Sequence, residues 1–253
     1  MILNKFDLTG KTAIVTGSST GLGQAMAMGL AQAGANIVGV YNSTPPPNVG
    51  AIEDLGVKFL GVQADLSSTS VIKSIIDKSI EAFGTINILV NNAGILRRDD
   101  ALTFSEKDWD DVMNVNLKSV FFLCQAVANH FIAKKIKGKI INIASMLSFQ
   151  GGIKVSSYTS SKSGVLGLTR LLACEWASND ININAIAPGY MATANTQPLR
   201  DDEIRNRQIL ERIPAGVWGK PEDLQGAVIF LASEASNYVN GFTLAVDGGW
   251  LAR

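Results

Sequence analysis

Histidine is nearly absent from this chain, and cysteine is scarce. His130 is the only histidine among 253 residues, and Cys124 and Cys174 are the only cysteines. A histidine-based triad could use only His130, and zinc sites draw on several histidines or cysteines, so both are disfavoured and no bound metal is expected. We expect His130 to be structural, and each cysteine to be a small buried residue in a reducing cytoplasm.

Net charge and long apolar runs are lacking too. The chain carries 22 basic and 22 acidic residues, so its charge gives no reason to expect nucleic acid as a partner. No apolar run reaches membrane-spanning length, and the first residues lack the apolar core of a signal peptide. We therefore expect a cytoplasmic protein without a membrane partner. A composition of 47% hydrophobic and 17% charged residues indicates a well-buried globular protein.

Short apolar segments alternate with helical patterns along the whole chain. Strands that are apolar throughout and alternate with helices indicate a parallel sheet covered on both faces. The predicted fold is one α/β domain, residues 1–253, with a doubly wound, Rossmann-type sheet of about seven strands. The predicted strands are 12–16, 36–41, 57–63, 86–90, 139–143, 181–187 and 243–246, and the predicted helices are 22–33, 69–83, 105–131, 157–177 and 221–232. A segment of mixed polarity at about 190–220 interrupts this pattern, and we interpret it as a substrate lid rather than a surface excursion.

A glycine-rich turn, Thr16-Gly17-Ser18-Ser19-Thr20-Gly21-Leu22-Gly23, joins the first predicted strand to the first predicted helix. Glycine lets the backbone approach a pyrophosphate closely, and the helix that follows presents free N–H groups. The spacing is not the usual G-x-G-x-x-G, and an ordinary turn is the alternative. Its place between a strand and a helix favours a dinucleotide site.

The end of the second predicted strand is where NAD and NADP are usually distinguished. An acid there would bind the ribose of NAD, and an arginine would hold the 2′-phosphate of NADP. Tyr41, Asn42 and Ser43 supply neither, and Thr20 adds no cation. The missing cation favours NAD without excluding NADP. Asp65, after the third strand, could accept a hydrogen bond from adenine or could cap a helix.

Tyr158 and Lys162 lie four residues apart in a predicted helix and therefore share one face. A phenol ionises near pH 10, and a neighbouring ammonium is expected to lower that pKa. The pair is a candidate acid and base for a carbonyl or an alcohol, although the same spacing also occurs by chance on solvated helices.

Together these features resemble the short-chain dehydrogenase/reductase family over essentially the whole chain. Ser145 precedes Tyr158 by the thirteen residues usual in that family. The matching motifs, in order, are Thr16-Gly17-x-x-x-Gly21-x-Gly23, Asn91-Asn92-Ala93-Gly94, Asn116, Ser145, Tyr158-x-x-x-Lys162, and Pro188-Gly189 with Thr193.

The resemblance implies a role for each residue. Tyr158 would be the acid in reduction and the base in oxidation, with Lys162 lowering its pKa and holding the nicotinamide ribose. Ser145 would orient the carbonyl oxygen, and Asn116 would hold a water that links Lys162 to solvent. The other residues implied in cofactor binding are Gly17, Ser19, Thr20, Gly21, Leu22, Gly23, Tyr41, Asp65, Leu66, Asn92, Ala93, Gly94, Pro188, Gly189, Met191 and Thr193.

The connecting segments are similar to the 2-dehydro-3-deoxy-D-gluconate 5-dehydrogenases, also called 2-deoxy-D-gluconate 3-dehydrogenases. These segments are 104–113, 143–152, 187–193 and 246–253. The resemblance implies NAD(H)-linked interconversion of a 3-deoxy-hexodiulosonate and 2-keto-3-deoxygluconate in uronate breakdown. It also implies a homotetramer. The divergent 41–48 region leaves the cofactor preference open.

A sugar-acid substrate carries a carboxylate that calls for a cation. Arg97 and Arg98 directly follow the Asn-Asn-Ala-Gly turn, and Gln150 could address a hydroxyl. We hypothesise that Arg97 or Arg98 contributes to carboxylate binding, while Ser145 and Tyr158 contact the carbonyl. A solvated or interface arginine is the alternative for either one, and Arg253 is a second candidate.

Two other functions remain open. One is the same chemistry on another substrate, as in a 3-oxoacyl-carrier-protein reductase or a polyol dehydrogenase; an acyl carrier would need a larger basic docking patch than two arginines. The other is a nucleotide-sensing regulator without catalysis. Such proteins commonly lose the tyrosine or the lysine, and both are present here.

Overall fold

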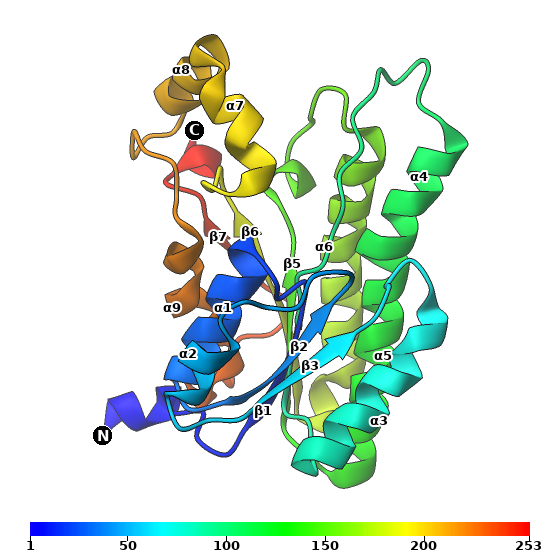
Figure 1. Ribbon diagram of the computed structural model, residues 1–253, viewed down its shortest axis with the longest axis vertical. Helices are drawn as coiled ribbons and strands as arrows, with labels where there is room; N and C mark the ends of the chain where they lie inside the picture. The colour runs from blue at the N-terminus through cyan, green and yellow to red at the C-terminus, as the bar shows by residue number, and fades with distance from the viewer.

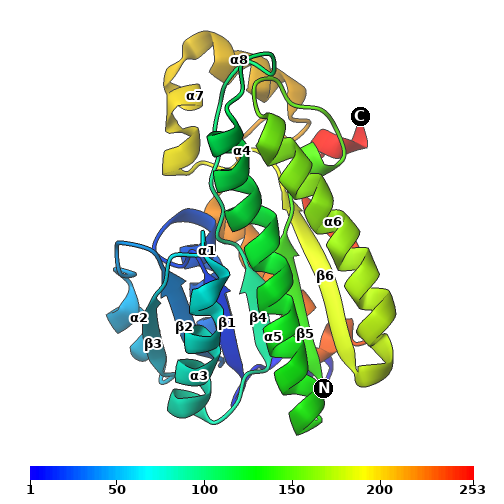
Figure 2. The ribbon, with the colours of Figure 1, turned by 90° about the vertical axis from the view of Figure 1, so that its right-hand side faces the viewer.

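A parallel sheet of seven strands forms the centre of the protein. The computed structural model describes all 253 residues. The strand order is β3-β2-β1-β4-β5-β6-β7, and all neighbours are parallel (Figure 1, Figure 2). The strands are β1 (Thr12–Thr16), β2 (Asn36–Tyr41), β3 (Phe59–Gln63), β4 (Ile88–Asn91), β5 (Gly138–Ile143), β6 (Ile181–Pro188) and β7 (Thr243–Val246). The predicted doubly wound sheet is confirmed; the third and fourth strands begin two residues later than predicted.

Helices bury both faces of this sheet, which explains why its strands are apolar throughout. Ala13 and Val15 of β1 face the core beneath α1 (Gly21–Gln32) and α9 (Gln225–Ala232), whereas Ile14 between them faces the opposite core. That second core lies beneath three helices on the other side of the sheet (Figure 1). They are α3 (Ile72–Phe83), α5 (Ser119–Lys134) and α6 (Ser156–Trp176).

The predicted helix 105–131 is not one α-helix. Ser105 caps α4 (Glu106–Met113) by accepting a hydrogen bond from the Asp108 backbone at 3.1 Å. A π-helical segment, Asn114–Lys118, then separates α4 from α5. A single π-helical turn changes the spacing of the apolar residues only slightly. The hydrophobic periodicity of the sequence therefore did not reveal it. Such insertions are frequent at functional sites.

The 190–220 segment contains two helices that sequence periodicity missed, α7 (Gln197–Asp201) and α8 (Glu203–Arg212). Asp202 starts α8 by accepting hydrogen bonds from the backbone of Ile204 and Arg205 at 3.0 Å each. Ile209 is the one fully buried residue of α8, so its apolar pattern is weak. Both helices lie beyond the carboxyl ends of the strands (Figure 1). A further short helix, α2 (Val49–Glu53), follows β2.

The single histidine and the two cysteines test the expectations drawn from composition. His130 is structural as predicted, because its buried Nε2 accepts a hydrogen bond from the Ile86 backbone at 3.2 Å. Cys124 is buried, but the prediction for Cys174 was wrong: this residue of α6 is exposed. No helix combines the length and the apolar character needed to cross a bilayer.

Candidate active site

The glycine turn lies at the carboxyl end of β1, where the chain order reverses between β1 and β4. Ligands of doubly wound sheets bind in the crevice at such a reversal. Gly17 has a φ of +66°, and a Cβ on Gly23 would lie 2.1 Å from the Gly17 carbonyl oxygen. Thr16 Oγ1 accepts hydrogen bonds from the backbone of Asn92 and Ala93 at 3.0 Å each. The turns after β1 and β4 are thus fastened together.

This turn fits a dinucleotide pyrophosphate. α1 begins at Gly21 without a side-chain cap from Thr20, which leaves the first N–H groups of the helix available to an anion. The Thr193 methyl lies 3.5 Å from the position of a Cβ on Gly21. The 190–220 segment therefore meets the turn at the point where the phosphates would lie.

The other predicted cofactor residues fall into two groups. Tyr41, Asp65, Ser19 and Gly94 lie at the open edge of the crevice, and Asp65 Oδ1 already accepts a hydrogen bond from Ser67 N at 2.9 Å. The side chains of the second group pack against the core, so only their backbones could contact a nucleotide. This second group comprises Leu22, Leu66 and Met191.

Pro188 and Gly189 follow β6 at the same edge of the sheet. A Cβ on Gly189 would lie 2.5 Å from the Asp247 Cα. Only glycine therefore allows the chains after β6 and β7 to approach so closely.

The predicted catalytic residues come together beside this crevice. Ser145 follows β5, while Tyr158 and Lys162 lie on α6. Lys162 Nζ donates to the Ile143 carbonyl oxygen at 2.6 Å and lies 5.8 Å from the centre of the Tyr158 ring. Ser148 Oγ donates to the Lys162 carbonyl oxygen at 2.7 Å, which fastens the Ser145 loop to α6.

The pKa of Tyr158 does not follow the expectation from sequence. Burial of the phenol raises its pKa above the usual value and outweighs the Ser145 hydroxyl and the Arg98 charge, both of which lower it. The ammonium of Lys162 was predicted to lower this pKa, and that prediction was wrong for the chain by itself. Burial also lowers the pKa of Lys162 to about 8, because a desolvated ammonium is disfavoured.

Asn116 lies within the π-helical segment and is fully buried. Its Oδ1 accepts from Ile95 N at 2.8 Å, and its Nδ2 donates to Ile95 O at 2.9 Å and to Ser161 Oγ at 3.2 Å. Asn116 thus connects the loop after β4 to the residue next to Lys162. The predicted bridging water stays a prediction.

The two neighbouring arginines are placed differently. Arg97 Nε lies 3.3 Å from Asp108 Oδ1, and Arg97 NH2 lies 3.9 Å from Asp111 Oδ2. Arg98 forms no ion pair and lies close enough to Tyr158 to lower its pKa. Asp99 N, next in the chain, donates to the Lys154 carbonyl oxygen at 3.2 Å, which holds this loop against the approach to α6.

Arg212 and Trp250 also border the site, and sequence reasoning did not select either one. Arg212 NH2 donates to Gln150 Oε1 at 2.9 Å, and its guanidinium lies 4.0 Å from the centre of the Trp250 ring. Arg253, the second candidate, instead donates to the Glu211 carbonyl oxygen at 2.9 Å. α8 carries several arginines, so no local pattern distinguishes Arg212.

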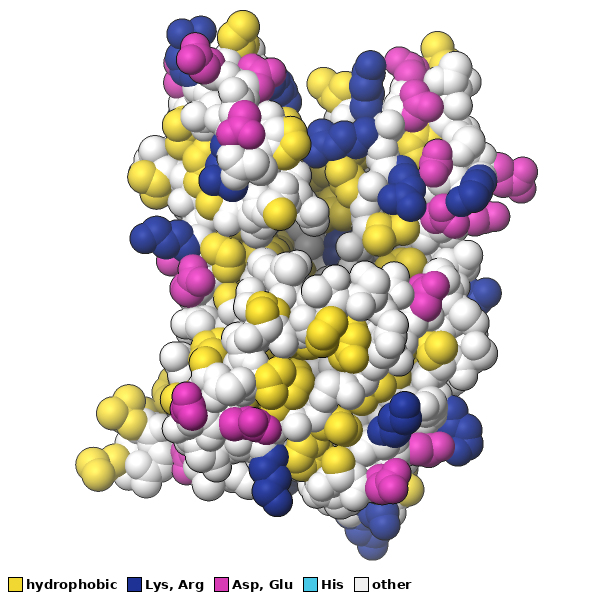
Figure 3. Space-filling view, viewed as in Figure 1, with side chains coloured by type: hydrophobic (Ala, Val, Ile, Leu, Met, Phe, Trp, Pro, Cys, Tyr) yellow, Lys and Arg dark blue, Asp and Glu magenta, His cyan; other side chains and the backbone are white.

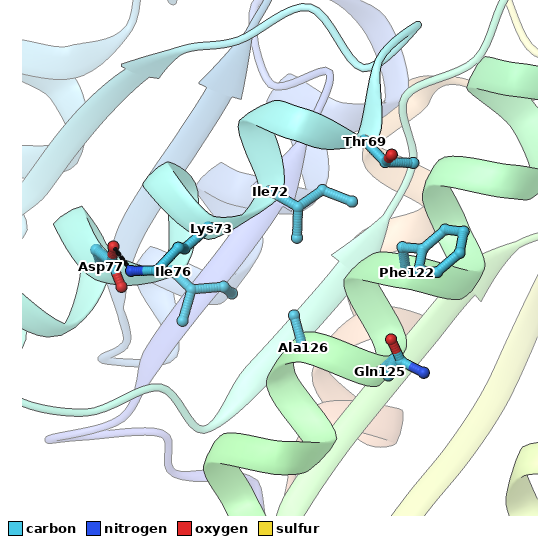
Figure 4. Close-up of a pocket in the computed structure, with 8 residues that line it drawn as sticks. All are labelled: Thr69, Ile72, Lys73, Ile76, Asp77, Phe122, Gln125 and Ala126. Carbon is cyan, nitrogen blue, oxygen red and sulfur yellow. Dashed lines mark hydrogen bonds and ion pairs between the residues drawn. The ribbon is translucent and has the colours of Figure 1, made fainter.

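Figure 3 shows a deep notch between two projections, with basic side chains on its walls. α7 and α8 form one projection, and α4 with the start of α6 forms the other (Figure 1). A separate groove of about 320 Å³ lies between α3 and α5, where Ile72, Ile76 and Ala126 face one another (Figure 4). No predicted site residue lines that groove. No three His, Cys, Asp or Glu side chains are grouped as metal ligands would be.

Known proteins share both the sequence and this fold. The family model described as enoyl-(acyl carrier protein) reductase matches residues 17–251. The 2-dehydro-3-deoxy-D-gluconate 5-dehydrogenase of Escherichia coli (strain K12) is 64% identical over the full length of both chains.

Two solved structures are similar as well. A candidate 2-deoxy-D-gluconate 3-dehydrogenase of Agrobacterium tumefaciens with bound NADP is 53% identical, with a TM-score of 0.93 over 99% of this chain and 100% of that one. A gluconate 5-dehydrogenase of Burkholderia cenocepacia in complex with NADP and tartrate is 40% identical, with a TM-score of 0.94 over both whole chains. The motifs, the sheet and these matches agree that the chain belongs to the short-chain dehydrogenase/reductase family, whose members are NAD(P)-dependent oxidoreductases.

Proposed function

We propose that this protein interconverts a 3-deoxy-hexodiulosonate and 2-keto-3-deoxygluconate, or 2-deoxygluconate and its 3-keto form, in the cytoplasmic breakdown of uronic acids. The observation that carries the proposal is the grouping of Ser145, Tyr158 and Lys162 next to an unpaired cation, Arg98. A small molecule that carries both a carbonyl and a carboxylate would suit this grouping, with the carbonyl at Ser145 and Tyr158 and the carboxylate attracted by Arg98. The sugar-acid dehydrogenases among the relatives support the same substrate class.

The protein supplies proton transfer and orientation in this reaction. A phenol is protonated at neutral pH, and burial raises the pKa of Tyr158 further, so in reduction it can donate its proton to the carbonyl oxygen. Ser145 Oγ accepts from Leu147 N at 3.2 Å, and its hydroxyl interacts with the Tyr158 phenol, so a substrate oxygen placed between the two side chains could accept from both. Lys162 has N–H groups left for ribose hydroxyls, and a bound nicotinamide would supply or accept the hydride.

Charge on the site walls would select an acidic substrate. Arg97 is engaged by two carboxylates, so of the two candidates we assign Arg98 to attract the sugar acid. The 190–220 segment, which meets the glycine turn through Thr193, would close over the bound substrate as a lid.

NAD is the proposed cofactor, because Tyr41, Asn42 and Ser43 offer no cation for a 2′-phosphate. NADP in the two solved relatives makes the comparison of cofactors part of the test. A higher kcat/KM with NADH than with NADPH is expected. A clear preference for NADPH would overturn this assignment.

We also propose a homotetramer, as in the family resemblance. Trp109 on α4, Phe122 on α5 and Leu171 on α6 are each at least 36% exposed, and association would bury this apolar surface. Light scattering coupled to size-exclusion chromatography measures the assembly directly. A monomer at micromolar concentration would contradict this part of the proposal.

The substrate is tested by assaying the purified protein against keto-deoxy sugar acids, neutral polyols and acyl ketones, each with NADH or NAD and with NADPH or NADP. We expect the highest kcat/KM on the keto-deoxy hexonates. Activity confined to acyl ketones would replace the proposed substrate by an acyl chain. Full cofactor binding without turnover of any substrate would favour a regulator.

A further inference from the structure

Arg212, the last residue of α8, is held against the loop that begins with the catalytic Ser145. Its NH2 group donates to Gln150 Oε1 at 2.9 Å, and Gln150 N donates back to the Met146 carbonyl oxygen at 3.3 Å. The guanidinium carbon lies over the Trp250 ring, 4.0 Å from its centre, which is within cation–π range. One hydrogen bond and one cation–π contact therefore hold the Arg212 side chain at this place.

The ring beneath Arg212 is buried and well packed. Trp250 is 4% exposed and packs with Met146, Ile209 and Ile213 in one small core. The Tyr190 ring meets Trp250 edge-on, with 4.9 Å between ring centres. This core joins α8, the C-terminal turn and the residue next to Ser145, so the guanidinium has a fixed place relative to the catalytic loop.

Most of the hydrogen-bonding capacity of Arg212 is unused. A guanidinium has five N–H donors in a planar fork, and Gln150 is the only protein acceptor of Arg212. No carboxylate lies within 4.0 Å of it, whereas Arg207 on the same helix pairs with Glu211, and Arg97 pairs with Asp108. Arg212 is thus a cation held in position without a counter-ion.

We propose that Arg212 binds the carboxylate of the substrate through this fork. The proposal rests on the proposed function for the substrate class. In a hexonate the carboxylate lies several bonds from the reacting carbonyl, and Arg212 is set back from Ser145 by the 145–150 loop. A fixed guanidinium suits two parallel hydrogen bonds to a carboxylate. Arg98, on the opposite wall beside Tyr158, attracts the same anion without forming the fork.

Carboxylate binding at Arg212 also holds the lid in place. Arg212 belongs to α8, while Gln150 and Trp250 belong to the catalytic loop and the C-terminal turn. A bound acid therefore adds a connection between the lid and the site that a neutral analogue does not provide.

The test compares D-gluconate with D-gluconamide, which has the same shape without the charge. Calorimetry measures the binding of each to the protein saturated with NADH, so that gluconate is not oxidised. The variants are Arg212→Met, Arg212→Lys and, as the matched control on the same helix, Arg207→Met. Because no turnover is needed, the result can be read even if the keto-deoxy hexonate assay fails.

Arg212→Met is expected to weaken gluconate binding about ten- to a hundredfold, with gluconamide binding unchanged. The gluconate affinity of Arg212→Lys is expected to lie between those of wild type and Arg212→Met, because lysine keeps the charge and lacks the planar fork of donors. Arg207→Met should change the affinities for gluconate and for gluconamide by less than about twofold. Equal weakening of both ligands by Arg212→Met would show a packing role and overturn the proposal. Unchanged gluconate binding, or a wild type that does not prefer gluconate to gluconamide, would overturn it as well.

Discussion

A buried lysine lies at each end of strand β5, and only one of them belongs to the candidate active site. Lys139, at the amino end, is 6% exposed. Lys162 reaches the carboxyl end of the strand from α6 and is 5% exposed. Burial lowers the pKa of each to about 8. Burial and charge therefore do not distinguish a functional lysine from a structural one.

The acceptors around each ammonium do distinguish them. An ammonium has three N–H donors. Lys139 Nζ donates to Asn182 Oδ1 at 2.8 Å, to Asn237 Oδ1 at 2.9 Å and to Ser236 Oγ at 3.4 Å, so the protein satisfies all three. Lys162 has a single protein acceptor, the Ile143 carbonyl oxygen, and two of its donors are left for a ligand.

Replacing Tyr158 should give the largest effect, because it removes the proposed proton donor of the reaction. The amino end of β5 has no counterpart to this phenol. Tyr158→Phe removes only the hydroxyl, and we expect kcat to fall about a thousandfold while NADH binding and thermal stability stay unchanged. Steady-state kinetics and fluorescence titration with NADH measure the two quantities. Substantial remaining turnover would mean that another group transfers the proton.

Lys162→Met should lower kcat about a hundredfold and weaken cofactor binding. The free energy of unfolding should not fall, because a poorly solvated ammonium with one protein hydrogen bond is removed. Kinetics and chemical denaturation of the same preparation test both statements. A large loss of stability would show that Lys162 is structural, like Lys139.

Lys139→Met should show the opposite result. It removes three hydrogen bonds, partly offset by loss of a desolvated charge, so we expect the free energy of unfolding to fall by about 1 kcal/mol. Both kcat and KM should stay within about twofold of wild type, since the residue lies at the amino end of β5 and the candidate site lies at the carboxyl ends of the strands. Loss of activity in a folded, cofactor-binding variant would break the comparison.

A pH dependence of stability, in contrast, should not distinguish the two lysines, because both share it. Each folded-state pKa, about 8, lies below the ordinary value of 10.5, so above pH 8 the unfolded chain holds protons that the folded chain has released. The free energy of unfolding should therefore rise between pH 8 and about 9.5, by about 1–2 kcal/mol per lysine.

Denaturation curves at these two pH values measure the slope. Lys139→Met and Lys162→Met should each remove about half of it, and the double variant should remove most of it. A slope that is flat or negative in the wild type would contradict the low pKa values.

Local chemistry made much of the site predictable. Only glycine fits at positions 17 and 23. Tyr158 and Lys162 lie close together as their helical spacing implied, and Ser145 lies beside them as the family resemblance implied. The roles of residues whose contact partners are distant in sequence could not be predicted. Asp108 and Asp111 engage Arg97 and not Arg98, which no local pattern shows.

The amino-acid sequence alone determined the strands, the glycine turn and the catalytic pair on α6, because apolar period, backbone freedom and helical spacing act over a few residues. Only the tertiary structure decided that burial raises the pKa of Tyr158 and that a π segment carries Asn116. It also brought Arg212 to Gln150 and Trp250. Solvent exclusion and contacts between distant segments arise only once the chain has packed.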